Sequence, residues 1–217
     1  MAKQNEHGKL IAAAAKAALL PLGFRRKGQS RCWYSDERFW YIFIEFQPSA
    51  WSRGTYTNVT PIWFFLRHGS GATARRVADY IEFESVEQFT PLIEQMARLA
   101  AEEAVALRTK FKTPLDVHRY FASRITENAS RIYCAAITAG LVGDFDLARQ
   151  LFARMAAMDP AKSGLRLPNY QKECAALSAL LDNPAGYRSA VLEIITMQRQ
   201  KRGLSPDPRS LESLDFG

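Results

Sequence analysis

Cysteine and histidine are scarce in this sequence, and their scarcity excludes several kinds of site. The three cysteines, Cys32, Cys134 and Cys174, lie far apart along 217 residues, and no CxxC pair is present. Their spacing from the three histidines does not suit a zinc site. We therefore expect buried thiols in a reducing cytoplasm rather than a disulfide framework. No metal ion and no cofactor is expected.

Long apolar runs are also absent. No stretch approaches the roughly 18 consecutive apolar residues that a membrane-spanning helix needs. The most apolar N-terminal segment, Ile11–Leu22, is interrupted by Lys16 and runs through Pro21 into strand-like sequence. This pattern favours a surface helix with an alanine-rich inner face over a signal peptide. We expect no membrane association.

Recognisable catalytic signatures are missing as well. Gly69-Ser70-Gly71 lacks the Lys-Ser/Thr of a phosphate-binding loop. His68 opens this glycine-containing loop, and His118 lies on an amphipathic helix without a nearby nucleophile motif. The sequence therefore favours a protein that is not an enzyme. A small enzyme whose reactive residues meet only in space stays an alternative.

What the first half does contain is strong strand patterning. Trp40, Ile42, Ile44 and Phe46 alternate with a second set of mostly large side chains, which predicts a strand over 39–47. The predicted elements of this half are helices over 4–20 and 86–111 and strands over 31–35, 39–47, 56–67 and 78–84.

The two faces of this predicted sheet are both apolar near its middle. A sheet with one solvated face shows cleaner alternation, so we expect each face to be covered. The two helices can cover one face, and the C-terminal half or a partner would cover the other. Pro61 lacks a backbone donor and therefore implies a sheet edge or a bulge.

The second half reads as helical throughout. Thr113-Pro114 and Asn183-Pro184 each combine a helix cap with proline at the first helical position. The fold class expected is therefore α+β: a small antiparallel sheet of three or four strands with two helices, followed by helical hairpins. The expected divisions are a sheet domain over 1–112, a helical region over 113–203 and an irregular tail over 204–217.

Residues 10–110 resemble an uncharacterised bacterial domain family of unknown function. The resemblance is carried by Gly23-Phe24-Arg25-Arg26-Lys27, by Phe46-Gln47-Pro48-Ser49 after a strand, and by Asn58-Val59. These match a pattern of G-F-basic-basic, strand, F-Q-x-S and N-[VL]. The resemblance implies a bacterial protein with a small α+β domain and an antiparallel sheet, and it implies no chemistry.

Residues 128–160 are similar to one tetratricopeptide repeat. The similarity is densest over Gly143–Phe152, and Met155 departs from it where an alanine is usual. It implies two antiparallel helices that approach closely through small side chains. The sequence has no second clean copy, so we expect a helical appendage on the sheet domain rather than a solenoid. The residues that carry the similarity are Ile132, Ala136, Ala139, Gly143, Phe145, Ala148, Phe152 and Pro160.

Basic and aromatic side chains cluster in the first half, which also carries most of the net charge of +7. Arginine with tryptophan or tyrosine is typical of protein interfaces, and cationic grooves with stacking aromatics are typical of single-stranded nucleic-acid binders. A sheet core beside a solvated turn also explains the pattern. Gln47 and Asn58 either brace a loop or line a small polar pocket. The candidate binding residues are Arg25, Arg26, Lys27, Arg31, Gln47, Trp51 and Asn58.

The function that this sequence favours is binding to another protein, with a role like that of an immunity protein as one form. Nucleic-acid binding through the surface around Arg25–Tyr41 is the alternative. The sequence does not set the oligomeric state.

Overall fold

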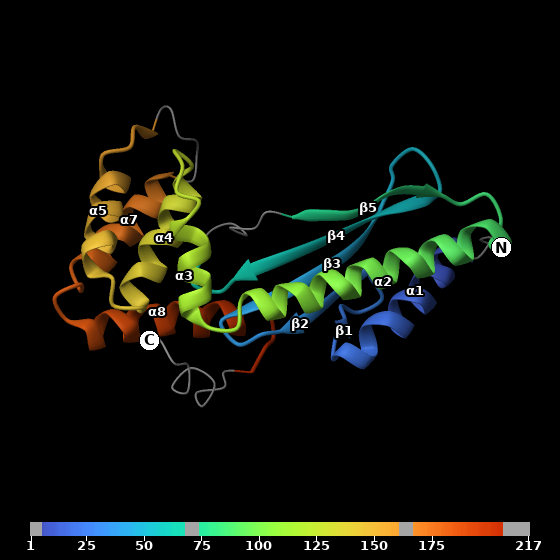
Figure 1. The fold of residues 1–217 in the computed structure, drawn as a ribbon, viewed down its shortest axis with the longest axis horizontal. Coiled ribbons are helices and arrows are strands. Elements are labelled where there is room, and N and C mark those ends of the chain that lie inside the picture. Colours follow the sequence, from blue (N-terminus) through green and yellow to red (C-terminus); the bar gives the residue numbers. More distant parts are fainter. Residues whose placement is uncertain (1–5, 68–73, 161–166, 206–217) are drawn as a thin grey trace. The chain divides into compact units, whose positions relative to one another are not determined.

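The structure is a computed structural model that describes residues 6–67, 74–160 and 167–205 (Figure 1). The expectations for His68 and its glycine loop lie outside these residues, as do those for the tail beyond Ser205. None of the helices that are described is long and apolar enough to cross a membrane.

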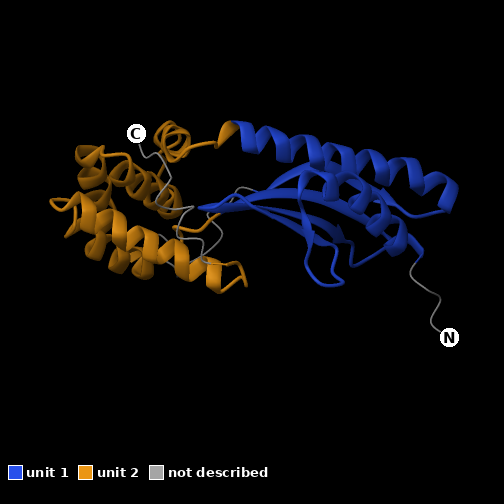
Figure 2. Cartoon of the chain, turned by 90° about the horizontal axis from the view of Figure 1, so that it is seen from below, with its two compact units in different colours: residues 1–62, 72–109 blue, residues 63–71, 110–217 orange. Residues whose placement is uncertain are grey.

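The chain divides into two units, which are coloured separately in Figure 2. Unit 1 comprises Met1–Ile62 and Ala72–Thr109, and unit 2 comprises Trp63–Gly71 and Lys110–Gly217. The sheet and its two helices make up unit 1, and the helical half makes up unit 2. The short segment after the fourth strand therefore belongs with the helices that follow much later in the chain.

Unit 1 is an antiparallel sheet with helices, which confirms the predicted α+β class. Its strands are neighbours in chain order, from β1 to β5. The sheet has five strands where three or four were expected, because Arg25 and Arg26 pair with Tyr34 and Trp33 instead of forming only a turn. The elements are α1 (Glu6–Leu19), the 3-10 turn η1 (Leu20–Leu22), β1 (Arg25–Arg26), β2 (Cys32–Asp36), β3 (Trp40–Pro48), β4 (Gly54–Trp63), β5 (Arg75–Glu82) and α2 (Val86–Lys110).

The core of unit 1 lies between one face of the sheet and its helices. The alternation in β3 places Trp40, Ile42, Ile44 and Phe46 on the same side, and all four are at most 2% exposed. The apolar stripe of α2 is buried as well, and it includes Phe89, Ile93, Met96, Ala97 and Ala100. Burying each large side chain contributes about 1.5–3 kcal/mol. The alternation in β3 and the helical spacing in α2 thus both place their buried side chains in one core.

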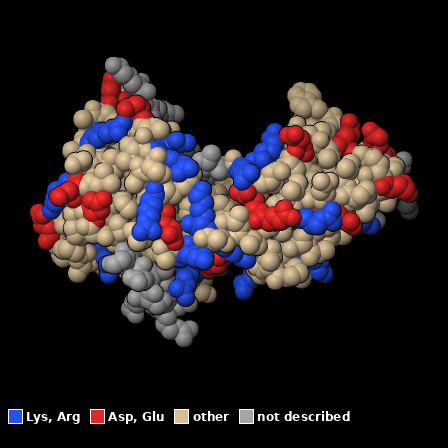
Figure 3. Space-filling view, in the orientation of Figure 1, with Lys and Arg blue, Asp and Glu red and all other residues tan. Residues whose placement is uncertain are grey.

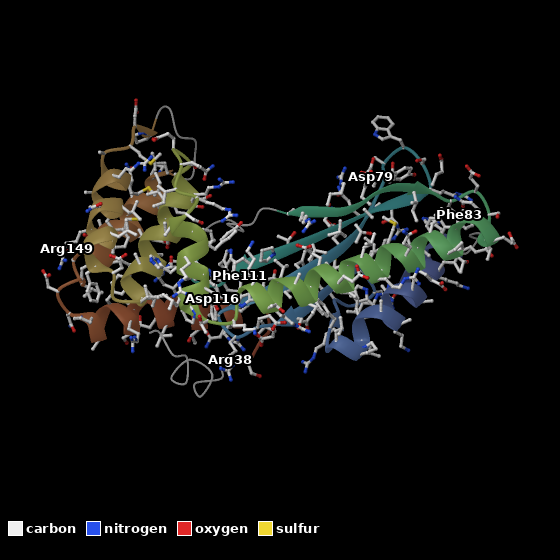
Figure 4. The ribbon with its side chains drawn as sticks, viewed as in Figure 1. Arg38, Asp79, Phe83, Phe111, Asp116 and Arg149 are labelled. Atoms are coloured by element: carbon white, nitrogen blue, oxygen red, sulfur yellow. The ribbon has the colours of Figure 1, made fainter. Side chains whose placement is uncertain are left out.

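The turns that shape unit 1 follow local sequence signals. Gly23 has a φ of 81°, and its N–H donates to the Leu20 carbonyl, which ends the first helical segment as predicted. Arg38, which is labelled in Figure 4, has a φ of 73° in the turn between β2 and β3. Pro61 lies in β4, an interior strand, but two residues beyond Val59, the last residue observed to pair with β5. Its missing N–H therefore leaves the described part of that pairing intact.

The described part of unit 2 is mostly helical. Thr113 forms a capping box with Asp116, and the Asn183 side chain accepts the Gly186 N–H, so both predicted helix starts are confirmed. The described helices are α3 (Pro114–Ala122), α4 (Ala129–Leu141), α5 (Phe145–Ala156), α7 (Leu167–Ser178) and α8 (Pro184–Gln200).

The segment with tetratricopeptide similarity forms a helical hairpin. Helices α4 and α5 lie side by side (Figure 1), and Gly143, with a φ of 85°, lies in the turn that joins them. Membership of the repeat class itself stays a prediction. The apolar and small residues that suggested it are buried in the hairpin: Ile132, Ala136, Ala139, Ala148 and Phe152.

Candidate binding surface on the sheet

One face of the sheet in unit 1 carries a set of half-buried aromatic side chains. The pairing of β2 with β3 sets Tyr34 opposite Phe43 and Asp36 opposite Tyr41. These residues alternate with the buried Trp33 and point away from the core. We call this surface the aromatic face and define it by Tyr34, Tyr41, Phe43, Tyr56 and Tyr80, all of them half-buried.

The aromatic face is the second sheet face, for which coverage by the C-terminal half or by a partner was expected. Helices α1 and α2 lie together on the other face (Figures 1 and 2), and no described helix of unit 1 covers this one. The sequence of this face looks apolar because most of its large side chains are tyrosine and phenylalanine. Tyrosine combines an apolar ring with a hydroxyl that can stay hydrated, so a face of tyrosines is compatible with partial exposure to solvent. Whether a partner covers it stays a prediction.

The aromatic face is ordered at its β4–β5 side by ring contacts. The Arg76 guanidinium lies 4.1 Å from the centroid of the Tyr56 ring. The centroids of the Tyr56 and Tyr80 rings are 4.9 Å apart. The Tyr80 hydroxyl also forms a hydrogen bond with the Ser52 hydroxyl. A cation held over a ring at this distance stabilises both side chains. Sequence reasoning did not find the cluster of Tyr56, Arg76 and Tyr80. The register shifts on either side of Thr57 make it impossible to read from the sequence which residues of β5 lie beside Tyr56.

Gln47 and Asn58 lie on the same face and are joined to each other. The Asn58 side-chain amide donates to Gln47 Oε1 at 2.8 Å across β3 and β4. The Gln47 carbonyl also accepts the Thr55 hydroxyl at 3.1 Å. Of the two interpretations of this pair, the bracing role is the one that these bonds support. The pair fixes the strands beside the aromatic rings.

Trp51 stands apart from these contacts at the end of the β3–β4 hairpin. It is 95% exposed, the most exposed large apolar side chain among those described. Its backbone N–H donates to the Ser49 hydroxyl at 3.1 Å, which orders the tip that presents it. A fully exposed tryptophan on an ordered tip is typical of a residue that a partner buries.

The predicted basic cluster does not form one cationic surface. Arg25 and Arg26 are exposed on the short edge strand β1. Arg26 closes the turn after β1, because its guanidinium donates to the Ser30 and Gln29 carbonyls at 2.7 and 2.9 Å. Lys27 lies in the same turn, and its N–H donates to the Cys32 carbonyl. Only Arg25 lies opposite a residue of the aromatic face, Tyr34.

Arg31 is separated from that edge by its own contacts. Its guanidinium donates to His7 Nε2 at 2.9 Å and reaches the Gly54 carbonyl at 3.5 Å. Burial lowers the pKa of Arg31, and burial together with the charges of Arg31 and Arg53 lowers the pKa of His7. Arg31 therefore ties helix α1 to the start of β4.

Charges of both signs are interspersed over the face of unit 1 that Figure 3 shows, without a continuous basic area. Within the described parts of the chain, no group of three or more His, Cys, Asp or Glu side chains could hold a metal ion. Comparisons with protein-family models, with curated proteins and with solved structures found no match to this chain. Both sequence resemblances therefore stay predictions.

His118, the other histidine singled out in the sequence, is a buried residue of unit 2. Its Nε2 lies 3.8 Å from Asp144 Oδ2, and its Nδ1 is buried without a hydrogen-bond partner among the described residues. Burial lowers the pKa of His118, Asp144 acts in the opposite direction, and Arg119 adds to the lowering. The imidazole is therefore held neutral in the folded protein.

The neutral His118 leads to a pH-dependent stability. Because the unfolded chain takes up this proton near pH 6.5 and the folded chain only at lower pH, the free energy of unfolding falls as the pH drops below about 6.5. We expect the melting temperature of the wild type to decrease from pH 7 to pH 5. His118→Phe should reduce that decrease and leave the part due to His7, whose pKa is also lowered. An equally steep decrease in the variant would contradict this assignment.

Proposed function

We propose that this protein binds another protein through the aromatic face of unit 1. The observation that carries the proposal is a sheet face of five half-buried aromatic rings that no described helix of its own unit covers. Interface centres are enriched in tyrosine, tryptophan, phenylalanine and arginine and depleted of lysine and carboxylates. Trp51 at the hairpin tip extends the same surface chemistry beyond the sheet.

The charge on this face favours a protein over a nucleic acid. Arg25 and Arg76 are the exposed cations beside the rings, and Arg76 already lies over Tyr56. Asp36 and Glu45 stand on the same face, since they lie opposite Tyr41 and Cys32 in the β2–β3 pairing. Nucleic-acid affinity comes mostly from cations that neutralise phosphates, so a charge-balanced aromatic face supports the alternative less well.

The proposal is tested by removing two central rings of the face. The double variant Tyr34→Ser, Phe43→Ser should lose a protein partner that wild type retains in affinity purification from its native lysate, with recovery reduced by about tenfold or more. The matched control, Leu20→Ser, Val105→Ser, removes two apolar side chains of unit 1 that are 52% and 46% exposed. It should retain the same partner at the wild-type level.

Two further measurements separate the alternatives. Melting temperatures of both variants show whether a lost interaction reflects a lost face or a lost fold. Fluorescence anisotropy with single-stranded oligonucleotides tests the nucleic-acid alternative, because such binding weakens steeply as salt increases. Retention of every wild-type partner by a folded Tyr34→Ser, Phe43→Ser variant would contradict the proposal.

A further inference from the structure

Unit 2 contains a groove that the sequence did not indicate. It has a volume of about 460 Å³ and lies between helices α7 and α8, with Arg67 at one side. All of its described lining belongs to unit 2. The groove is therefore independent of the aromatic face and of any proposal made for it.

The floor of the groove is apolar. Leu177 and Ile194 form a floor in which each is at most 4% exposed, and Leu180 and Met197 are half-buried along its sides. Side chains of this kind at the bottom of a groove stabilise a ligand that buries its own apolar groups there. The described lining thus offers an anchor position for one or two apolar side chains.

Charged side chains also line the groove, and three of them are cationic. Arg67, Lys172 and Lys201 line it, and the side chain of Arg67 is 36% exposed. Glu173 also lines it, but its side chain is only 13% exposed and lies 3.6 Å from the Arg67 guanidinium. Glu193 is the exposed carboxylate of the lining. The described lining therefore presents an excess of positive charge.

A buried tyrosine holds Glu173 in this inward position. The Tyr133 hydroxyl donates a hydrogen bond to Glu173 Oε2, and the Tyr133 side chain is fully buried. Burial and the charge of Glu173 raise the pKa of Tyr133 far above its ordinary value, so the hydroxyl keeps the proton that it donates. Glu173 is thus engaged by Tyr133 and Arg67. The positive charge that the groove presents then comes from Lys172 and Lys201.

The length of the groove fits a peptide. Its lining follows α7 from Asn169 to Leu177 and continues to Leu180 beyond the end of that helix. At 1.5 Å per residue, the helical part alone is about 12 Å long, which matches about four residues of extended chain. A ligand of a few atoms would fill only part of such a groove.

We propose that the α7–α8 groove binds a short acidic peptide segment of a partner protein. One apolar side chain of the peptide occupies the floor at Leu177 and Ile194, and its carboxylates face Lys172 and Lys201. Charge complementarity and the length of the groove carry this assignment. A ligand of this chemistry recognises the apolar floor and the cationic side chains of the groove at once.

The test begins with a displayed library of random 12-residue peptides selected against the full chain. We expect enrichment of peptides that combine aspartate or glutamate with a leucine-like or aromatic anchor. The affinity of a labelled, enriched peptide, measured by fluorescence anisotropy, should fall by about tenfold or more in Lys172→Glu, Lys201→Glu, because charge reversal turns attraction into repulsion. Leu180→Ser should weaken the same peptide through loss of apolar contact.

The matched control is Lys16→Glu, Lys112→Glu, which changes the net charge equally at two exposed lysines outside the groove lining. It should bind the peptide like wild type. Enriched peptides without acidic residues, or equal affinity in the Lys172→Glu, Lys201→Glu variant, would overturn the proposal. Self-association that this variant abolishes would assign the groove to a second copy instead. Binding that appears only in a chain ending at Ser205 would assign it to residues 206–217.

Discussion

Replacing Arg108 with methionine is expected to lower the free energy of unfolding of unit 1 by about 2–4 kcal/mol. The Arg108 guanidinium donates to Glu37 Oε1 at 2.8 Å, to the Ser35 hydroxyl at 2.6 Å and to the Leu22 carbonyl at 3.0 Å. It also lies 5.3 Å from the centroid of the Phe24 ring. One side chain of α2 thereby joins η1, strand β2 and the β2–β3 turn.

The cost follows from what the substitution leaves behind. The Glu37 side chain is 19% exposed, so methionine would leave a poorly solvated carboxylate beside Ser35 without its cation. Removing one partner of a largely buried ion pair is costly even where the pair as a whole contributes little. Methionine preserves much of the apolar stem of arginine, so the expected loss reports the charge and the hydrogen bonds more than the packing.

Urea denaturation measures this effect, with Arg98→Met as the control. Arg98 is an exposed arginine on the same helix, so its replacement removes the same charge and should change stability by less than about 0.5 kcal/mol. A second variant, Glu37→Gln, should recover part of the loss when it is combined with Arg108→Met, because it removes the unpaired charge. Equal effects of the two arginine substitutions would contradict the role given to Arg108.

Replacing Gly140 with valine is expected to destabilise unit 2 by about 3 kcal/mol or more. A Cβ at this position in α4 would lie 2.4 Å from Cζ of Tyr187 on α8. Tyr187 is fully buried, and its hydroxyl donates to the Ile137 carbonyl at 3.1 Å, so its ring has no open space to enter. Valine has a higher helix propensity than glycine, so the loss of stability would come from the steric clash with the Tyr187 ring.

A double-mutant cycle isolates this collision. Tyr187→Ala alone should destabilise unit 2 by leaving a cavity. Combined with Gly140→Val, it should cost at least about 1 kcal/mol less than the sum of the two single changes, because the valine then fills part of the vacated space. Unfolding followed by urea denaturation gives all four free energies. Additive effects would show that Gly140 and Tyr187 do not compete for the same space.

The sequence by itself determined the elements whose signals are local. Alternation in 39–47 identified the strand β3 and set Trp40, Ile42, Ile44 and Phe46 on one of its faces. Gly23 marked the end of the first helical segment, and Thr113 and Asn183 marked two helix starts. These succeed because strand faces, helix caps and left-handed stops depend on a few neighbouring residues. The α+β class follows from the same signals.

Only the tertiary structure decided which side chains meet. Tyr56, Tyr80 and Arg76 form part of one face through a register that two shifts near Thr57 displace, and Arg67 joins Glu173 from more than a hundred residues away. Arg26 and Arg31 belong to one predicted basic cluster, but Arg26 closes a turn and Arg31 ties a helix to a strand. Such pairings depend on strand register and helix packing over long sequence separations, which composition and periodicity do not encode.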